Sequence, residues 1–327
     1  MVHKVLIVGC GNIAGRLDEL RQSDSTTPPL SHAGAYSQNR RFLITGCVDP
    51  DRKRRSEFQK YWNVENGYDT LAEVSQQGSK FDVVSVCSPT SFHLEHLKLV
   101  LALSPALVFC EKPIGDDFAE ARNLEESYSY KKIPLLINYS RRFDESVNRL
   151  KHEVETGIYG DLRSVSGYYN KGLLNNGSHF LDLLRFLLGD LTVDYTGRPV
   201  VDFKESDPTV PLVLLASDGT PISLSTGNAN DFSLAELTFV FSKAQVTMMD
   251  GGLKWSYRHV EKSELYSGYQ VLQAPRFETG MLLHSLENAV ANIDDVLAGR
   301  KIPLCSGKDG LEVLELCAEI LARVQSS

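Results

Sequence analysis

The sequence predicts an α/β protein with a parallel sheet wound by helices in its N-terminal part and a large, mostly antiparallel open sheet in its C-terminal part. Two observations support this class. Apolar segments of strand length alternate with helix-length segments over the first 140 residues, and strand-like segments follow one another at hairpin spacing from residue 210 onward. Because 327 residues exceed the usual size of one hydrophobic core, we predict two domains, residues 1–140 and 141–327.

The strands expected in the first domain are apolar throughout, which is typical of strands that helices cover on both faces. Such strands pair in parallel and are connected by helices. They are KVLIVG (4–9), FLITGCVD (42–49), DVVSVCSP (82–89), LVFCEKP (107–113) and IPLLINYS (133–140).

The second domain is expected to begin with a helix over 143–156, a strand over 162–169 and a helix from Phe180. Helical periodicity returns over 279–298 and 307–325, and the last helix is a candidate to pack back on the first domain. Short turns separate the strands between these helices. These strands are VPLVLLAS (210–217), PISLSTGN (221–228), AELTFVFS (235–242), AQVTMMDG (244–251) and GLKWSYR (252–258).

The composition, with 42% hydrophobic and 23% charged residues, is that of a soluble globular protein. A net charge of −8 argues against binding to nucleic acid, which needs clustered cations. The six cysteines form no CxxC pair, so we expect buried thiols and no metal site. No segment reaches the roughly 18 apolar residues of a membrane span, and the N-terminal apolar run is too short for a signal peptide. We therefore expect a cytoplasmic protein without a nucleic-acid or membrane partner.

The motif GCGNIA (9–14) lies between the first strand and a helix candidate. Gly9 and Gly11 allow a tight turn and a close approach of the backbone to a pyrophosphate, which the helix start at Asn12 and Ile13 stabilises. In this context the pattern predicts a Rossmann domain that binds a dinucleotide. A glycine turn that serves the backbone alone is the alternative.

Asp49 ends the next strand, where its carboxylate is expected to accept hydrogen bonds from a ribose and to repel a 2′-phosphate. It favours NAD over NADP, although Arg52 and Lys53 are alternative partners for that phosphate. Asp49 follows Gly11 by 38 residues, against about 20 in the usual fingerprint. We attribute the excess to an inserted loop over residues 18–30, either a lid near the cofactor or a solvated surface loop.

Two polar segments, CSPTSFH (87–93) and CEKP (110–113), each end a strand. Ligands bind beyond the carboxyl ends of parallel strands, so we expect both segments, including Ser88, to face the cofactor. Lys112 stands out, because a lysine beside apolar strand residues is costly to bury without a partner or a purpose. A surface lysine is the alternative.

Over most of its length the chain resembles the glucose-fructose oxidoreductase and inositol dehydrogenase family, Gfo/Idh/MocA. The resemblance implies a Rossmann domain followed by an α/β domain whose open sheet mediates homodimer or homotetramer formation. It also implies an NAD(P)-dependent oxidoreductase that acts on a hydroxyl group of a sugar or cyclitol. The motifs that carry it, in the family's order, are the glycine turn, Asp49, SPTSFH, EKP, NYSRRF (138–143), GIYGDL (157–162) and GSHFLD (177–182).

The same resemblance implies roles for single positions in the first domain. Glu111 and the peptide after Lys112 approach the nicotinamide, and Lys112 contacts the reacting oxygen of the substrate. Pro89 and Thr90 line the cofactor pocket, and His93 begins the following helix.

In the second domain His179 matches the histidine of the family's D-x-G-x-H motif, and the sequence departs from that motif at Asn175. An asparagine can orient a hydroxyl group but cannot take its proton, which leaves His179 or Lys112 as the acid/base. Imidazole titrates near neutrality, whereas a lysine needs surroundings that lower its pKa. We favour His179 as the acid/base and Lys112 as the donor that polarises the oxygen, with the reverse assignment open.

Three further residues complete the expected site. Asp182 shares a helix face with His179 and either orients the imidazole or simply follows the preference of acids for helix starts. Lys171 and Asn175, with Arg142 in the interdomain cleft that the resemblance implies, suit a polar or phosphorylated substrate.

We therefore predict an NAD(H)-dependent oxidoreductase that transfers a hydride between the nicotinamide and a ring hydroxyl or ketone of a sugar. A nucleotide-linked sugar is expected, because KGLLNNGSH (171–179) resembles family members from bacterial surface-sugar pathways. A dehydrogenase of a free aldose, inositol or cyclic diol is the alternative within this class. A non-catalytic NAD(P)-binding sensor is the alternative from another class, and the presence of both Lys112 and His179 argues against it.

Overall fold

The computed structural model describes residues 2–21 and 27–325, which form two compact units. The first unit comprises the described residues up to Phe143 together with Leu283–Leu314. The second comprises Asp144–Leu282 and the described residues from Glu315 on. That these units serve as a cofactor domain and a substrate domain stays a prediction.

A six-stranded parallel sheet forms the centre of the first unit, with the strand order β3-β2-β1-β4-β5-β6. The order reverses between β1 and β4, and in a sheet of this topology the connecting helices are expected on both faces. All residues of β4 and β5 are buried, and apart from Ser85 they are apolar, as expected for strands covered on both faces. The strands are β1 (His3–Val8), β2 (Phe42–Val48), β3 (Asn66–Tyr68), β4 (Val83–Val86), β5 (Leu107–Cys110) and β6 (Leu135–Ile137).

Short polar side chains begin several helices of this unit. The side chains of Ser31, Asp51, Thr70 and Asp117 each accept a backbone N–H of the first helical turn. The helices are η1 (Asn12–Arg16), α1 (Leu17–Arg21), α2 (His32–Gln38), α3 (Arg52–Trp62), α4 (Leu71–Gln76), η2 (Thr90–Phe92), α5 (His93–Leu103), α6 (Phe118–Tyr130), η3 (Ser140–Phe143) and α9 (Ser285–Leu297).

The inserted segment expected over residues 18–30 begins as helix α1 rather than as a loop. Residues 22–26 lie outside the described residues. Asp18 is buried and its carboxylate accepts the N–H of Leu30 at 2.9 Å and the hydroxyl of Ser31 at 2.5 Å. The two described ends of the segment are therefore held together, and Ser31 is fixed as the cap of α2.

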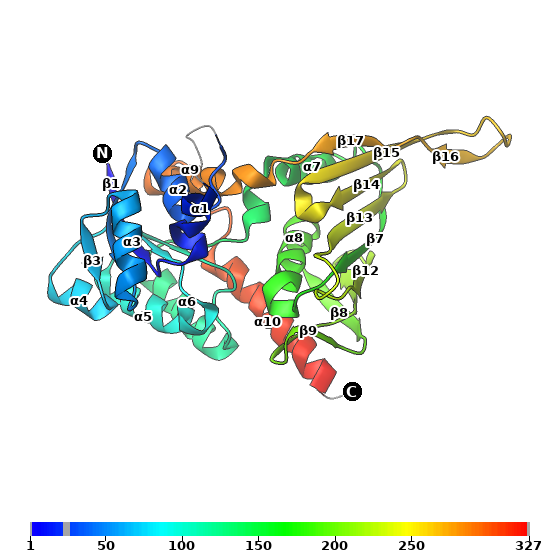
Figure 1. Ribbon diagram of the computed structural model, residues 1–327. Coiled ribbons are helices and arrows are strands. Elements are labelled where there is room, and N and C mark those ends of the chain that lie inside the picture. Colours follow the sequence, from blue (N-terminus) through cyan, green and yellow to red (C-terminus); the bar gives the residue numbers. More distant parts are fainter. Residues whose placement is uncertain (1, 22–26, 326–327) are drawn as a thin grey trace. The chain divides into compact units, whose positions relative to one another are not determined.

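A nine-stranded, mostly antiparallel sheet, here called the large sheet, forms the second unit, with the order β16-β15-β14-β13-β7-β12-β11-β8 and β17 beside β15. Strand β7 lies between β12 and β13 and pairs in parallel with β12. Strands β12 and β13 therefore do not form a hairpin, although they follow one another in the sequence. Figure 1 shows β15 and β16 projecting as a ribbon beyond their neighbours. The strands are β7 (Leu162–Tyr169), β8 (Leu191–Thr196), β11 (Leu212–Ala216), β12 (Pro221–Thr226), β13 (Ala235–Phe241), β14 (Ala244–Met249), β15 (Lys254–Lys262), β16 (Gln270–Leu272) and β17 (Arg276–Thr279).

A separate two-stranded ribbon, the β9–β10 hairpin, lies outside the large sheet and was not predicted. It consists of β9 (Val200–Lys204) and β10 (Asp207–Thr209). The remaining helices are α7 (Glu145–Glu155), η4 (Leu173–Gly177), α8 (Ser178–Leu188), η5 (Asp250–Gly252), η6 (Leu282–His284) and α10 (Gly307–Gln325).

All six cysteines lie within the described residues and are buried thiols, as predicted. A hydrogen bond with Cys47 and burial both raise the pKa of Cys10 far above its usual range. Over the described ranges, no helix is long and apolar enough to cross a membrane.

Candidate functional site

The glycine turn lies where the strand order of the parallel sheet reverses. Gly9 has a φ of +87°, and a Cβ atom there would lie 2.9 Å from the backbone N and Cα of Ser88. A Cβ atom at Gly11 would meet no atom of the described residues within 4 Å. The protein itself therefore requires glycine at position 9, whereas at position 11 it leaves a space that a ligand can fill. That space adjoins the first N–H groups of η1, where the fingerprint places a pyrophosphate.

Alanine at each position should separate these two requirements. Gly9→Ala is expected to destabilise the protein by about 1–3 kcal/mol, because the added methyl group meets the Ser88 backbone at an unfavourable φ. Gly11→Ala is expected to change the free energy of unfolding by less than about 0.5 kcal/mol but to weaken NAD binding by about tenfold or more. Denaturant unfolding and calorimetric titration measure the two effects. Unchanged NAD affinity in Gly11→Ala would contradict the assignment of this space.

The carboxylate of Asp49 connects the glycine turn to the end of β2. Its Oδ2 accepts the N–H of Cys10 at 2.8 Å, its Oδ1 accepts the N–H of Asp51 at 2.9 Å, and the residue is only 3% exposed. Nη1 of Arg54 lies 3.5 Å from Oδ2. The cation beside this carboxylate is therefore Arg54, which the sequence analysis did not single out, and Arg52 and Lys53 as partners for a 2′-phosphate stay a prediction.

His93 begins α5, as predicted, and is buried between two strand ends. Its Nδ1 lies 2.7 Å from the carbonyl oxygen of Pro113, and its Nε2 lies 2.8 Å from the carbonyl oxygen of Ser88. The Ser88 hydroxyl in turn lies 2.9 Å from Nδ1 of His96, and burial lowers the pKa of His96. His93 therefore ties the segment after β4 to the segment after β5.

Glu111 is the centre of a buried polar cluster. Its Oε1 lies 2.9 Å from Nε2 of His32, at the start of α2, and accepts a hydrogen bond from Nδ2 of Asn138 at 2.6 Å. Burial alone would raise the pKa of Glu111, but the contact with His32 and the Asn138 hydrogen bond outweigh it and hold this pKa below its usual range. Nδ1 of His32 and Oδ1 of Asn138 are buried and have no hydrogen-bond partner among the residues that the structure describes. These two atoms are available to a bound group.

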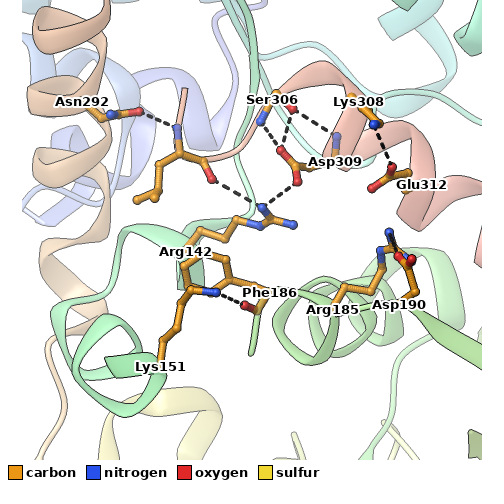
Figure 2. Close-up of polar contacts among 11 residues, drawn as sticks. Arg142, Lys151, Arg185, Phe186, Asp190, Asn292, Ser306, Lys308, Asp309 and Glu312 are labelled. Carbon is orange, nitrogen blue, oxygen red and sulfur yellow. Dashed lines mark hydrogen bonds and ion pairs between the residues drawn. The ribbon is translucent and has the colours of Figure 1, made fainter. Parts of the chain in front are cut away.

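Lys112 and Arg142 have different surroundings within the first unit. Lys112 is half-buried and precedes Pro113 through a cis peptide bond. Arg142 is buried, and its Nη1 donates to Oδ1 of Asp309 at 2.8 Å and to the carbonyl oxygen of Leu304 at 3.4 Å (Figure 2). Burial alone would raise the pKa of Asp309, but the charge of Arg142 helps to hold it below its usual range. Arg142 is thus anchored by the protein, and its contact with a substrate stays a prediction.

In the second unit, η4 leads directly into α8, so the polar residues before Phe180 are themselves helical. The N–H of Gly177 bonds to the carbonyl oxygen of Gly172, five residues earlier, at 3.0 Å. The glycine turn of the first unit enters η1 in the same way, with the N–H of Arg16 bonded to Gly11 at 3.3 Å. Such π turns occur often at functional sites.

Asn175 and His179 lie four residues apart in this helical segment and share one face. Both are half-buried, whereas Lys171 is exposed. Nδ2 of Asn175 donates to the carbonyl oxygen of Lys171 at 3.1 Å. Asp182 is fully buried, and its expected role in orienting His179 stays a prediction.

The predicted residues therefore form two groups. The structure brings the glycine turn and Asp49 together with the segments after β4 and β5, where Pro89 is exposed and Thr90 is half-buried. Lys112 belongs to the first unit and His179 to the second, so their joint action stays a prediction. Among the described residues, no three His, Cys, Asp or Glu side chains are grouped so that they could hold a metal ion.

Sequence reasoning missed His32, Asn138 and Arg54. The histidine lies within the mostly apolar segment LSHAGAY (30–36), a signal that a buried polar contact was needed. Asn138 follows β6, and the rule that parallel strands present polar residues at their carboxyl ends would have included it. For Arg54 only the N-cap at Asp51 offered a signal, because that cap sets which side chains of α3 face Asp49.

A family model described as an oxidoreductase family with an NAD-binding Rossmann fold, GFO_IDH_MocA, matches residues 3–139. Myo-inositol 2-dehydrogenase of Thermotoga maritima is 23% identical over 68% of this chain and 65% of its own length. D-glucoside 3-dehydrogenase of Escherichia coli is 26% identical over 57% of this chain and 54% of its own length. The chain thus spans less than two thirds of the length of these curated relatives.

Solved structures share the fold of both units. The WlbA dehydrogenase from Bordetella pertussis, in complex with NADH and UDP-GlcNAcA, matches with a TM-score of 0.77 over 99% of this chain and 97% of that chain, at 17% identity. The parallel sheet with its glycine turn is the Rossmann fold that the family model describes.

Proposed function

We propose that this chain, which belongs to the Gfo/Idh/MocA family through residues 3–139, is an NAD(H)-dependent oxidoreductase that moves a hydride between the nicotinamide and a ring hydroxyl or ketone of a sugar. The observation that carries the proposal is the open position at Gly11, beside which Asp49 is held by the N–H of Cys10. An acid at this place suits the ribose of NAD and opposes the 2′-phosphate of NADP.

The substrate in this proposal is a nucleotide-linked sugar. The bound UDP-GlcNAcA of the WlbA structure supports this class, and so does the polar segment with Lys171 and Asn175, with Arg142 as a further candidate. The similarity to the inositol dehydrogenase of Thermotoga maritima favours a second candidate function, oxidation of a free polyol. Formation of a homodimer or homotetramer through the large sheet is also part of the proposal.

Bound NAD would supply the hydride acceptor for oxidation of an alcohol. Lys112 would donate a hydrogen bond to the substrate oxygen, and His179 would take the hydroxyl proton and return it in the reverse direction. The reverse assignment of these two side chains is the alternative. The residues proposed to hold the cofactor are Gly9, Gly11, Asn12, Ile13, Asp49, Ser88, Pro89, Thr90, His93, Glu111 and Lys112.

The purified protein, supplied with NAD and a panel of UDP- and dTDP-linked sugars, tests the proposal through the nicotinamide absorbance. We expect turnover with at least one nucleotide-linked sugar. Turnover of inositol or simple diols, without turnover of any nucleotide-linked sugar, would favour the second candidate. If no sugar or polyol reacts and NAD still binds, the enzyme assignment is wrong.

Asp49→Ser should shift the cofactor preference toward NADP by about 10- to 100-fold, since it removes a charged acceptor and the repulsion of a 2′-phosphate. Arg54, whose Nη1 lies 3.5 Å from the present carboxylate, would then be available to the phosphate. Comparison of NAD and NADP dissociation constants measures the shift. Asp51→Ser is the matched control, because serine also caps α3 and the Asp51 carboxylate likewise lies near Arg54, with Oδ2 3.6 Å from Nη2, but among the described residues it accepts no hydrogen bond from the glycine turn. An equal shift in both variants would contradict the role of Asp49.

A further inference from the structure

The β9–β10 hairpin buries its polar residues instead of its apolar ones. In β9 the residues on either side of Asp202 are exposed and Asp202 itself is buried. In β10 the buried residues are Asp207 and Thr209. Two buried carboxylates are costly unless hydrogen bonds compensate them. The burial of Asp202 and Asp207 is therefore explained by the hydrogen bonds that their carboxylates accept.

Asp202 binds the backbone at the start of the polar segment. Its Oδ2 accepts the N–H groups of Lys171 and Ala229, each at 2.9 Å. Its Oδ1 accepts the hydroxyl of Thr209 at 2.6 Å, and that hydroxyl oxygen accepts the N–H of Gly172 at 2.7 Å. Burial alone would raise the pKa of Asp202, but these bonds hold it below its usual range, so the carboxylate is ionised near neutral pH.

Asp207 accepts two further N–H groups of the same segment. Its Oδ1 accepts from Leu174 at 2.7 Å and its Oδ2 accepts from Asn175 at 3.0 Å. These are N–H groups of the first turn of η4, which have no partner within the helix. A Cβ atom at Gly172 would collide with the Asp207 carboxylate, so the fit between hairpin and segment is close.

The segment that is held in this way has an unusual backbone. Lys171 has a φ of +69°, a conformation that residues other than glycine rarely adopt. Its side chain is exposed, while its N–H and that of Gly172 are fixed by the hairpin. The hydrogen bond from Nδ2 of Asn175 to the carbonyl oxygen of Lys171 links the two proposed substrate-binding residues.

We propose that the β9–β10 hairpin is a positioning element, in which Asp202 and Asp207 fix the backbone of residues 171–175 so that the side chains of Lys171 and Asn175 meet the sugar substrate in one orientation. The two aspartates act through the segment and not on the substrate. The identity of the ligand rests on the proposed function, whereas the fixation of the backbone does not. The carboxylate of Asp207 thus lies beside Asn175, the position at which the sequence departs from the aspartate of the D-x-G-x-H motif.

Asp202→Asn and Asp207→Asn test the proposal, with Asp218→Asn as matched control. Asp218 also accepts a backbone N–H, that of Thr220 at 2.9 Å, but in a turn of the large sheet. Loss of the charged acceptor is expected to raise the KM for the sugar about tenfold, with kcat changed by less than about threefold, NAD affinity unchanged and Asp218→Asn like the wild type. Hydrogen exchange of the amides at 171, 172, 174 and 175 is expected to become about tenfold faster. If Asp202→Asn does not fold, Thr209→Val and Asp207→Asn replace it.

A double-mutant cycle connects the hairpin to the side chain that it positions. In a Lys171→Ala background, Asp202→Asn should raise the KM much less than it does alone, because the positioned side chain is missing. The proposal is overturned if amide exchange over 171–175 is unchanged, if the KM changes no more than in Asp218→Asn, or if the two substitutions are additive. If the wild type oxidises no sugar, the proposed function fails, and amide exchange alone then decides whether the hairpin holds the segment.

Discussion

Lys112→Ala and His179→Ala are each expected to lower kcat by about 10²–10⁴-fold. This range is what a positioned proton donor or acceptor contributes. NAD binding is expected to remain unchanged in His179→Ala and to weaken in Lys112→Ala without being lost, because Lys112 is also among the residues proposed to hold the cofactor. Lys112 follows directly on Glu111, which is fixed by two buried side chains, and His179 lies one helical turn after Asn175. Steady-state kinetics with the reactive sugar, together with calorimetric titration of NAD, measure both quantities.

The pH dependence of kcat separates the two possible assignments. A base must be deprotonated to act, so activity falls at low pH as the base becomes protonated. The variant that lacks this base is expected to lose the acidic limb of the profile, and we expect that variant to be His179→Ala. Loss of the acidic limb in Lys112→Ala instead would establish the reverse assignment.

Matched controls for these variants are an exposed lysine and an exposed histidine. Lys98→Ala on α5 and His152→Ala on α7 remove the same side chains from solvent-facing positions. Both controls are expected to keep kcat within about twofold, as surface substitutions usually do. If Lys112→Ala and His179→Ala both keep kcat like the controls and still bind NAD, these residues are not catalytic, and the interpretation as a non-catalytic NAD-binding sensor replaces that as an enzyme.

Glu111→Ala is expected to destabilise the protein by roughly 2–6 kcal/mol, because two buried donors lose their acceptor at about 1–3 kcal/mol each. The donors are Nε2 of His32 and Nδ2 of Asn138. Glu111→Gln keeps the shape of the side chain and one acceptor oxygen, so its free energy of unfolding is expected to fall less than that of Glu111→Ala. Denaturant unfolding of both variants measures the effect, and Glu126→Ala, at an exposed position of α6, serves as the control.

The same cluster gives stability a pH dependence. The pKa of Glu111 is lowered in the folded protein. Between the pKa values of the unfolded and the folded state, the folded state therefore binds fewer protons than the unfolded state. The stabilisation that ionised Glu111 adds to the free energy of unfolding is therefore fully present above its ordinary pKa of about 4.3, and it is lost as the pH falls through the pKa of the folded state. The stability difference between wild type and Glu111→Gln should shrink in that direction. A difference that stays constant from neutral pH to below pH 4 would contradict the lowered pKa of Glu111.

Much of the first unit follows from the sequence alone. Strand segments such as VLIV (5–8) and LVFC (107–110) are apolar at every position because helices cover both faces of a parallel sheet, and that pattern needs no tertiary information to recognise. The glycine turn is equally local, since a φ of +87° at Gly9 admits little besides glycine. From these two features the nucleotide-binding end of the sheet could be placed, together with Asp49, Ser88 and Glu111.

The large sheet was predicted as mostly antiparallel, but its strand order was not. Hairpin spacing indicates which strands are close in sequence, and it cannot show that β7, from far earlier in the chain, inserts between β12 and β13. Strands as short as β16 and β17 carry too little pattern to be recognised. Long-range pairing is decided by which apolar faces meet in the folded protein.

The polar contacts that hold the candidate site were decided by tertiary structure. His32 meets Glu111 across 79 positions of the chain, and Asp202 meets the N–H of Lys171 across 31. The sequence by itself determined the Rossmann architecture, the glycine turn and the residue types offered for chemistry, because these depend on local backbone geometry and burial pattern. Which buried carboxylate satisfies which donor depends on the packing of distant segments, so only the tertiary structure identified the cluster around Glu111 and the role of the β9–β10 hairpin.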